Sequence, residues 1–122
     1  MGRLRKRADF LRVAASGRKW AAPGVIIQAD QMPAEETPEA DVRVGFTVTR
    51  KVGGSVIRNR ARRRLRAAAA AVIPGQSRAG FDFVLIGRQG TLTRPFPALV
   101  DDVAAALARL GATAPAPQKQ EP

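Results

Sequence analysis

The most constraining stretch of the chain runs from Arg58 to Arg66, where six of nine residues are arginine. Wound as an α-helix, this stretch and its flanks place five apolar residues in one stripe, as in an amphipathic helix that packs on a core: Ile57, Ala61, Leu65, Ala68 and Val72. We therefore predict a helix over residues 55–73. Ser55 is its expected N-cap, and Pro74 with the glycine after it is expected to end it.

Like charges crowd the rest of this predicted helix. Arg58 with Arg62, and Arg62 with Arg66, form pairs one turn apart, each unfavourable by roughly 0.2–0.5 kcal/mol. No acidic residue lies between Asp41 and Asp82 to relieve the repulsion. A merely solvated helix face normally mixes both signs of charge, whereas the planar fork of arginine binds phosphate bidentately and stacks on bases. The pattern favours a polyphosphate partner, and nucleic acid is the obvious one.

The net charge of +11 is unevenly distributed over the 122 residues, a length that suits a single domain. Residues 1–20 contain seven basic residues and one acidic residue, and residues 42–73 contain nine basic residues and no acidic one. Between them, residues 21–41 contain five acidic residues and no basic one. We expect the two basic blocks to converge in space, as in a nucleic-acid-binding protein.

The sequence contains no cysteine and no histidine. It therefore lacks disulfides, a thiol nucleophile, an imidazole base and a Cys/His metal site. Its longest uninterrupted apolar run, residues 67–73, is far too short for a membrane span. Asp9 and Arg12 interrupt any signal-peptide-like apolar region near the N-terminus. We expect a cytoplasmic protein.

Local patterns predict the elements that precede the arginine-rich helix. In order, we expect a flexible basic arm (1–7), a helix (8–15), a short strand around Trp20, a strand (25–29) and an acidic hairpin loop (31–41). In the first helix, Phe10, Val13 and Ala14 share a face. Residues 42–51 then alternate apolar and polar side chains, which predicts a half-buried strand.

The elements after the arginine-rich helix complete one domain. Residues 81–87 are almost continuously apolar and predict a central strand, which is expected to pair in parallel with the strand over residues 42–51. A helix over residues 95–110 is expected to bury four side chains: Leu99, Val103, Leu107 and Leu110. Residues 112–122 contain three prolines and no large apolar residue, which predicts a disordered tail. The single domain would then span residues 1–111.

Four segments occur in an order that matches a known signature. The run from Arg43 to Gly53 is followed by the "RNR" motif, Arg58–Asn59–Arg60. Before them stands the segment from Leu4 to Phe10, and after them the apolar strand from Asp82 to Arg88. Together, over about residues 4–110, these segments strongly resemble the bacterial ribonuclease P protein component, a family named by its RNR motif.

This resemblance implies a fold and a function. The fold is a two-layer α/β (α+β) sandwich of order αβββαβα, with the RNR helix in a left-handed βαβ crossover, against the usual handedness. The function is that of a subunit of a ribonucleoprotein endonuclease, which removes the 5′ leader from precursor tRNA. The partners implied are the ribonuclease P RNA and precursor tRNA, with no membrane and no small-molecule substrate. Catalysis belongs to the RNA subunit and uses Mg²⁺, so the resemblance implies no catalytic and no metal-binding residue on the protein, which is not expected to be catalytic alone.

The resemblance also assigns site residues. RNA binding is assigned to Arg50, Lys51, Arg58, Asn59, Arg60, Arg62, Arg63 and Arg66. A leader-binding cleft between the first helix and the sheet is assigned to Phe10, Ala14, Ile26 and Gln28. Ala14 stands where many members carry a second aromatic residue, so this cleft is less aromatic. Phe10 keeps two interpretations, stacking on a leader base, which contributes roughly 1–3 kcal/mol, or packing in the core.

Two other classes of protein fit part of the pattern. A non-catalytic RNA-binding protein, of the ribosomal or chaperone type, fits the composition equally well, and only the ordered motifs disfavour it. A self-sufficient nuclease would need a carboxylate cluster for metal ions, for which Asp82, Asp101 and Asp102 are the candidates. Such a nuclease would cleave RNA without an RNA subunit, whereas the protein partner of a ribozyme would be inert alone at low Mg²⁺.

Overall fold

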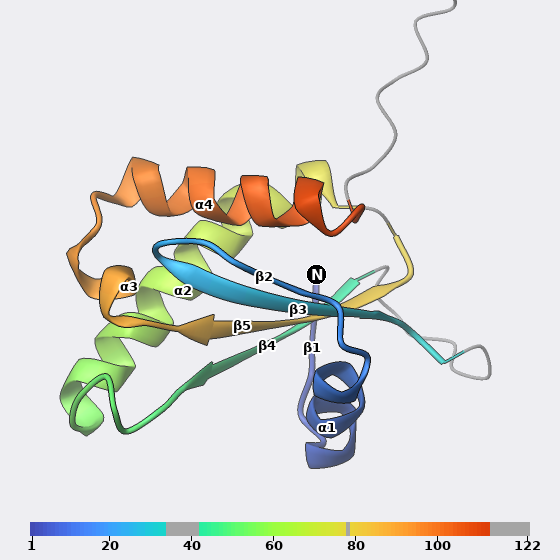
Figure 1. The fold of residues 1–122 in the computed structure, drawn as a ribbon, viewed down its shortest axis with the longest axis horizontal. Coiled ribbons are helices and arrows are strands. Elements are labelled where there is room, and N and C mark those ends of the chain that lie inside the picture. Colours follow the sequence, from blue (N-terminus) through green and yellow to red (C-terminus); the bar gives the residue numbers. More distant parts are fainter. Residues whose placement is uncertain (34–41, 78, 113–122) are drawn as a thin grey trace, which may run out of the picture.

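A computed structural model describes residues 1–33, 42–77 and 79–112, which contain five strands and four helices (Figure 1). In order they are β1 (Gly2–Arg3), α1 (Arg7–Ala15), β2 (Lys19–Ala21), β3 (Val25–Gln31), β4 (Val42–Val48), α2 (Ser55–Gln76), β5 (Phe81–Gly87), α3 (Gln89–Thr93) and α4 (Phe96–Arg109). The predicted series of helices and strands is present, together with two short elements that were not predicted, β1 and α3.

The strands form one sheet in the order β1-β4-β5-β3-β2. β4 and β5 pair in parallel, with Val44 opposite Phe83, and α2 connects them, so the predicted parallel βαβ unit is confirmed. β3 pairs antiparallel with β5, and β2 with β3, which puts β5 in the middle of the sheet. The left-handed sense of the β4–α2–β5 crossover stays a prediction.

The two faces of the sheet are covered unequally. α2 and α4 pack on one face and form the main core, which includes Phe83 and Leu85 from β5 and Leu65 from α2. α1 lies on the opposite side of the sheet (Figure 1) and packs on a smaller cluster that includes Val13 and Val84. Since side chains alternate between the faces along a strand, β5 serves both cores. The predicted α/β sandwich is confirmed.

The first turn of α2 differs from its prediction. The N-cap is Gly54 rather than Ser55, because the carbonyl of Gly54 already accepts the N–H of Arg58 at 2.9 Å. Ile57 is 44% exposed and does not join the core. It packs instead on the preceding loop, where a Cβ at Gly53 would come within 2.8 Å of the Ile57 side chain. The rest of the predicted stripe is buried: Ala61, Leu65, Ala68 and Val72.

The last turn of α2 extends three residues beyond the predicted end. The helix continues through Pro74 to Gln76, and the N–H of Ser77 closes it with a hydrogen bond of 2.9 Å to the carbonyl of Ile73. Proline lacks a backbone N–H, so it removes one hydrogen bond from a helix. Because Pro74 lies so close to the end of α2, this loss is limited to the final turn. Pro74 therefore does not stop the helix where the sequence predicted.

The N-terminal residues contribute to the sheet. Gly2–Arg3 pair in parallel with β4, and the N–H of Leu4 donates to the carbonyl of Val44 at 3.1 Å. The side chain of Leu4 is buried in the smaller cluster under α1. The prediction of a flexible arm over residues 1–7 is therefore wrong for residues 2–4, because the apolar side chain of Leu4 anchors the segment.

The remaining boundaries follow the predictions with local shifts. β4 ends at Val48 rather than at residue 51, because the chain turns there and the N–H of Val52 donates to the carbonyl of Thr49 at 3.1 Å. α4 buries the predicted stripe. Ala112 belongs to the main core rather than to the predicted tail.

Two stretches lie outside the described residues: 34–41, most of the predicted acidic loop, and 113–122, the rest of the predicted tail. Within the part of the chain that the structure describes, no helix is both long and apolar enough to cross a membrane.

Candidate nucleic-acid interface

The exposed side of α2 carries the predicted RNA-binding residues, which we call the arginine face: Arg58, Asn59, Arg60, Arg62, Arg63 and Arg66. Arg60, Arg63 and Arg66 are exposed, and Arg58 and Arg62 are half-buried. In the described structure, none of these arginines pairs with a carboxylate. Four residues of the face line a surface hollow together with an exposed apolar residue, Val56. The helix therefore presents cations that have no counter-charge among the described residues.

Three guanidinium groups of the arginine face have defined surroundings. Arg62 donates to the Oδ1 of Asn59 at 3.0 Å. The guanidinium of Arg66 lies over the half-buried ring of Phe46, 5.8 Å from its centre. The Nε of Arg58 is buried and has no hydrogen-bond partner among the described residues. The remaining N–H groups of these side chains are donors that a ligand can use.

Arg64 lies on the same helix, but its side chain makes contacts within the fold. Its Nε donates to the carbonyl of Thr91 at 2.7 Å, and its Nη2 donates to the carbonyl of Arg94. These contacts fasten α2 to α3 and to the residue after α3. Sequence reasoning left Arg64 out of the site, and its contacts agree with that omission.

The basic pair Arg50 and Lys51 is exposed in the turn between β4 and α2. The side chain of Gln89, at the start of α3, donates to the carbonyls of Val52 at 3.1 Å and Lys51 at 3.4 Å. This turn leads directly into α2, so the structure brings the basic pair to the same end of the sheet as the start of the arginine face.

A second candidate surface lies on the opposite face of the sheet, beside α1. The strand register forms two rows across this face: Gly45, Val84 and Gln28, then Thr47, Ile86 and Ile26. Val13 of α1 is fully buried with Val84, so α1 covers part of the first row. All three residues of the second row are half-buried. We define the open sheet surface as Phe10, Ile26, Gln28, Thr47 and Ile86.

Phe10 stands at the border between the small core and the open sheet surface. Its ring packs against the cluster of Leu4, Val13 and Val84, yet the residue remains half-buried rather than buried. Ala14, one turn further along α1, is exposed. The structure therefore brings three of the four predicted cleft residues to one face of the sheet, and Ala14 lies on the helix beside it.

Sequence reasoning missed Thr47 and Ile86 on this face. Their signal was present, because alternation along β4 puts Thr47 on the polar side of that strand and alternation along β5 puts Ile86 beside Val84. What the sequence could not supply was the pairing register, which aligns Ile86 with Ile26 on one side and Thr47 on the other.

Buried ion pairs hold the other flank of α1 to the sheet. Asp82 is fully buried and accepts two hydrogen bonds from Arg43, at 2.8 and 2.7 Å, and one from Arg12. Arg12 also donates to Asp30 at 2.7 Å. Burial acts to lower the pKa of the Arg12 guanidinium, but the hydrogen bonds to Asp82 and Asp30 raise it above its ordinary value. Arg12 and Arg43 therefore serve the fold.

The two basic blocks converge only in part: Gly2–Arg3 pair with β4, and Arg12 and Arg43 both donate to Asp82, but the helices of the two blocks are separated. The helix of the first block, α1, packs on one face of the sheet, and α2 packs on the other. The charge pattern alone gave no information about the sheet that separates these helices.

Comparison with known proteins identifies the family. The family model described as Ribonuclease P matches residues 2–111. The chain belongs to the ribonuclease P protein family. The ribonuclease P protein component of Paramagnetospirillum magneticum is 58% identical over 112 residues, which cover 92% of this chain and 84% of that protein. The ribonuclease P protein component of Gluconacetobacter diazotrophicus is 50% identical over 109 residues, which cover 89% and 90%.

Solved ribonuclease P proteins share the fold. The RNase P protein of Staphylococcus aureus aligns with a TM-score of 0.72 at 22% identity, over 93% of this chain and 99% of that chain. The protein from Thermotoga maritima aligns with a TM-score of 0.70 at 24% identity, over 89% and 97%. At these identities the likeness concerns the fold alone.

The candidate carboxylates of this ribonuclease P protein already have protein partners or stand apart. Asp82 is paired with two arginines. Asp102 accepts the N–H of Gly24 at 2.9 Å and lies 2.6 Å from the Nε of Arg94, whereas Asp101 is exposed on α4. Across residues 1–33, 42–77 and 79–112, no group of three or more His, Cys, Asp or Glu could hold a metal ion. Among the described residues, the three candidate carboxylates do not form such a group.

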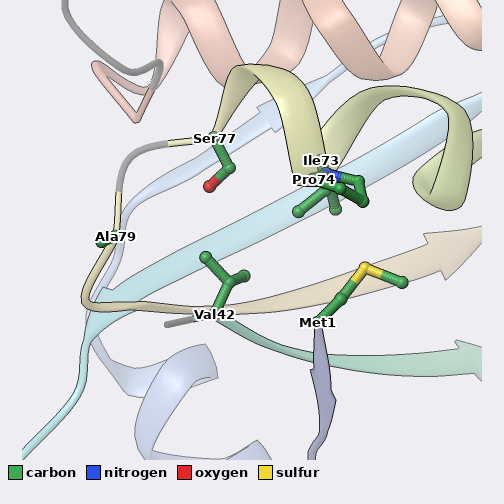
Figure 2. A pocket seen from close by; sticks show the side chains of 6 residues that line it. All are labelled: Met1, Val42, Ile73, Pro74, Ser77 and Ala79. Carbon is green, nitrogen blue, oxygen red and sulfur yellow. The ribbon is translucent and has the colours of Figure 1, made fainter. Parts of the chain in front are cut away.

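A small pocket of about 180 Å³ lies at the far end of α2 from the turn that carries Arg50 and Lys51 (Figure 2). Its lining comes from the N-terminus, the start of β4, the end of α2 and the segment between α2 and β5: Met1, Val42, Ile73, Pro74, Ser77 and Ala79. None of the predicted site residues lines this pocket.

Proposed function

We propose that this chain is the protein subunit of ribonuclease P and acts in the cytoplasm in removing the 5′ leader from precursor tRNA. Membership of the family supports the class of enzyme. The single observation that carries the RNA-binding role is the arginine face, whose cations have no carboxylate partner among the described residues. Like charges this close are unfavourable in an isolated domain and become favourable beside a polyanion.

The arginine face, with Arg50 and Lys51, is proposed to bind the catalytic RNA subunit. Guanidinium groups bind phosphate oxygens through two parallel hydrogen bonds. Each phosphate contact releases counter-ions, so the affinity is expected to fall steeply with salt. Arg64 is left out of this role because the Nε and Nη2 of its half-buried side chain already donate to backbone carbonyls.

The open sheet surface, with Ala14 beside it, is proposed to hold the 5′ leader of precursor tRNA. Gln28 offers an amide for hydrogen bonds to base edges, and Ile26 with Ile86 offers apolar contact. The accessible part of the Phe10 ring can stack on a base, while its other side packs on the small core. Phe10 thus combines the two interpretations that the sequence left open.

Catalysis is proposed to belong to the RNA subunit. In phosphodiester cleavage, Mg²⁺ supplies charge neutralisation and an activated water. The residues of this chain bind and orient the two RNAs and screen their phosphates from each other, so that the anionic substrate can approach the anionic ribozyme.

Cleavage of precursor tRNA at low Mg²⁺ tests the proposal with three samples: the protein, a bacterial ribonuclease P RNA, and both together. Correct cleavage at the 5′ end of the mature sequence only in the mixture would support the proposal. Cleavage by the protein alone would favour a self-sufficient nuclease. No activation, together with retained binding to the RNA, would favour the non-catalytic RNA-binding alternative.

A further inference from the structure

An exposed tryptophan marks one edge of the sheet. β2 is the edge strand beside β3, and its three residues are exposed: Lys19, Trp20 and Ala21. Trp20 is 39% exposed, and the guanidinium of Arg109, at the end of α4, lies 5.2 Å from the centre of its ring. An aromatic ring and a cation from two elements far apart in sequence therefore form a patch. Neither the arginine face nor the open sheet surface includes it.

The strand register connects this patch to the open sheet surface. Lys19 lies opposite Gln28, and Trp20 lies opposite Ile27. Because side chains alternate between the two faces, Lys19 shares the face of Gln28, whereas Trp20 shares the face on which α4 packs. Figure 1 shows β2 at the rim of the sheet, with α4 on one side and α1 on the other. A ligand that passes from Gln28 around this rim meets Lys19 first and Trp20 next.

The chemistry of the patch suits single-stranded RNA. Lys19 and Arg109 are exposed cations that phosphates can contact, and the exposed part of the indole offers a surface on which a base can stack. Asp30 lies on the same face, but its carboxylate already accepts a hydrogen bond from Arg12. An acidic peptide would match the charges, yet its carboxylate side chains would bring no planar ring to the indole.

We propose that Lys19, Trp20 and Arg109 form a single-strand RNA-binding site that extends the open sheet surface around the edge of β2. Lys19 and Arg109 contact phosphates of the leader at its end remote from the cleavage site, and one base stacks on Trp20. This inference rests on the proposed function, because the leader is the strand that the open sheet surface would deliver to the patch. Its consequence is that affinity depends on leader length.

The fluorescence of Trp20 provides a direct test, because the chain contains one tryptophan and no tyrosine. Holoenzyme assembled with a bacterial ribonuclease P RNA is titrated with precursor tRNAs whose leaders grow by one nucleotide at a time. We expect quenching that begins at a particular leader length and is absent with mature tRNA. Unchanged fluorescence while labelled long-leader substrate binds would overturn the proposal. Complete quenching by the RNA subunit alone would also overturn it, because the patch would then belong to that partner.

A pair of matched variants provides the second test. Trp20→Ala should weaken the affinity of the holoenzyme for long-leader substrate by about 5- to 10-fold, and leave short-leader affinity unchanged. Phe96→Ala is the control, because Phe96 is 38% exposed at the opposite end of α4. Equal losses in the two variants, or equal losses at every leader length, would overturn the site.

Arg109→Gln keeps the indole in place and should lower the salt dependence of long-leader binding alone. Thermal unfolding of each variant checks that the fold is intact. Failure of the unaltered protein to activate the RNA would count against the proposed function. Activation without any effect of Trp20→Ala and Arg109→Gln would count against this site only.

Discussion

The ring of Phe10 occupies the space that a side chain at Gly45 would need, since a Cβ there would lie 2.5 Å from the Cζ of Phe10. The absence of that side chain lets α1 approach β4. Gly45→Ala should overpack this contact and lower the free energy of unfolding by about 1–3 kcal/mol, measured by urea denaturation. Gly75→Ala is the control, because its added Cβ meets no atom within 4 Å. Equal stability of the two variants would contradict this account of the helix–sheet contact.

Phe10→Ala should affect both stability and substrate binding, because the ring is half-buried beside the open sheet surface. We expect a loss of about 1–3 kcal/mol in the free energy of unfolding, less than the roughly 3–5 kcal/mol of a fully buried phenylalanine. Affinity for precursor tRNA should fall while affinity for mature tRNA stays the same. Leu11→Ala, at a residue 56% exposed on the same helix, is the control. A stability loss with unchanged precursor affinity would leave Phe10 with a packing role alone.

Arg63 and Arg64 are neighbours in sequence with opposite expected effects. Arg63→Ala should weaken binding to ribonuclease P RNA and lower the slope of log affinity against log salt by about 0.7–0.9, with unchanged stability. Arg64→Ala removes two hydrogen bonds that join α2 to the α3 region, so it should lower the unfolding free energy by about 1–3 kcal/mol. Salt titrations and urea denaturation of both variants check this. An unchanged slope for Arg63→Ala would remove that residue from the interface.

Asp82→Asn would leave Arg12 and Arg43 without the charge that they share. Removing one partner of a buried ion pair is strongly destabilising, and we expect a loss of about 3–5 kcal/mol in the free energy of unfolding. Asp101→Asn, on the exposed side of α4, should change stability little. Thermal unfolding of the two variants is the measurement. Similar melting temperatures would contradict the role of Asp82 in holding α1 to the sheet.

The contribution of Arg12 should not depend on pH in the ordinary range. Its pKa is raised in the folded state, so the stability it adds is present at all pH values below the unfolded pKa. That stability is lost only as the pH rises through the folded-state pKa, above the usual arginine value. The stability difference between the unaltered protein and Arg12→Gln, measured by denaturation, should stay constant between about pH 6 and pH 9. A difference that shrinks across this interval would contradict the assignment.

Periodicity predicted the larger elements well, because each had enough residues to show a pattern. The stripe from Ala61 to Val72, the alternation of β4 and the apolar run of β5 all survive in the structure. β1 and α3 are too short to show a periodic pattern in the sequence. β1 is held by pairing with β4, and α3 is held by the hydrogen bond that Arg64 donates to it.

The candidate site was less accessible to sequence reasoning, because its surfaces are created by pairing. Ile57 fits the apolar stripe by spacing, yet the loop at Gly53 takes its side chain away from the core. In the sequence, Lys19 is only one more basic residue of the N-terminal block. In the structure, the β2–β3 register puts it beside Gln28. No single-sequence pattern contains that register.

The placement of α1 and α2 on opposite faces of one sheet has an evolutionary consequence. Substitutions on either side alter a surface that the other side does not touch. Under the proposed function, a lineage can therefore exchange residues beside α1 as its transcripts change, while α2 stays matched to the RNA subunit. Because the sheet separates the two surfaces, their residues can be substituted at different rates.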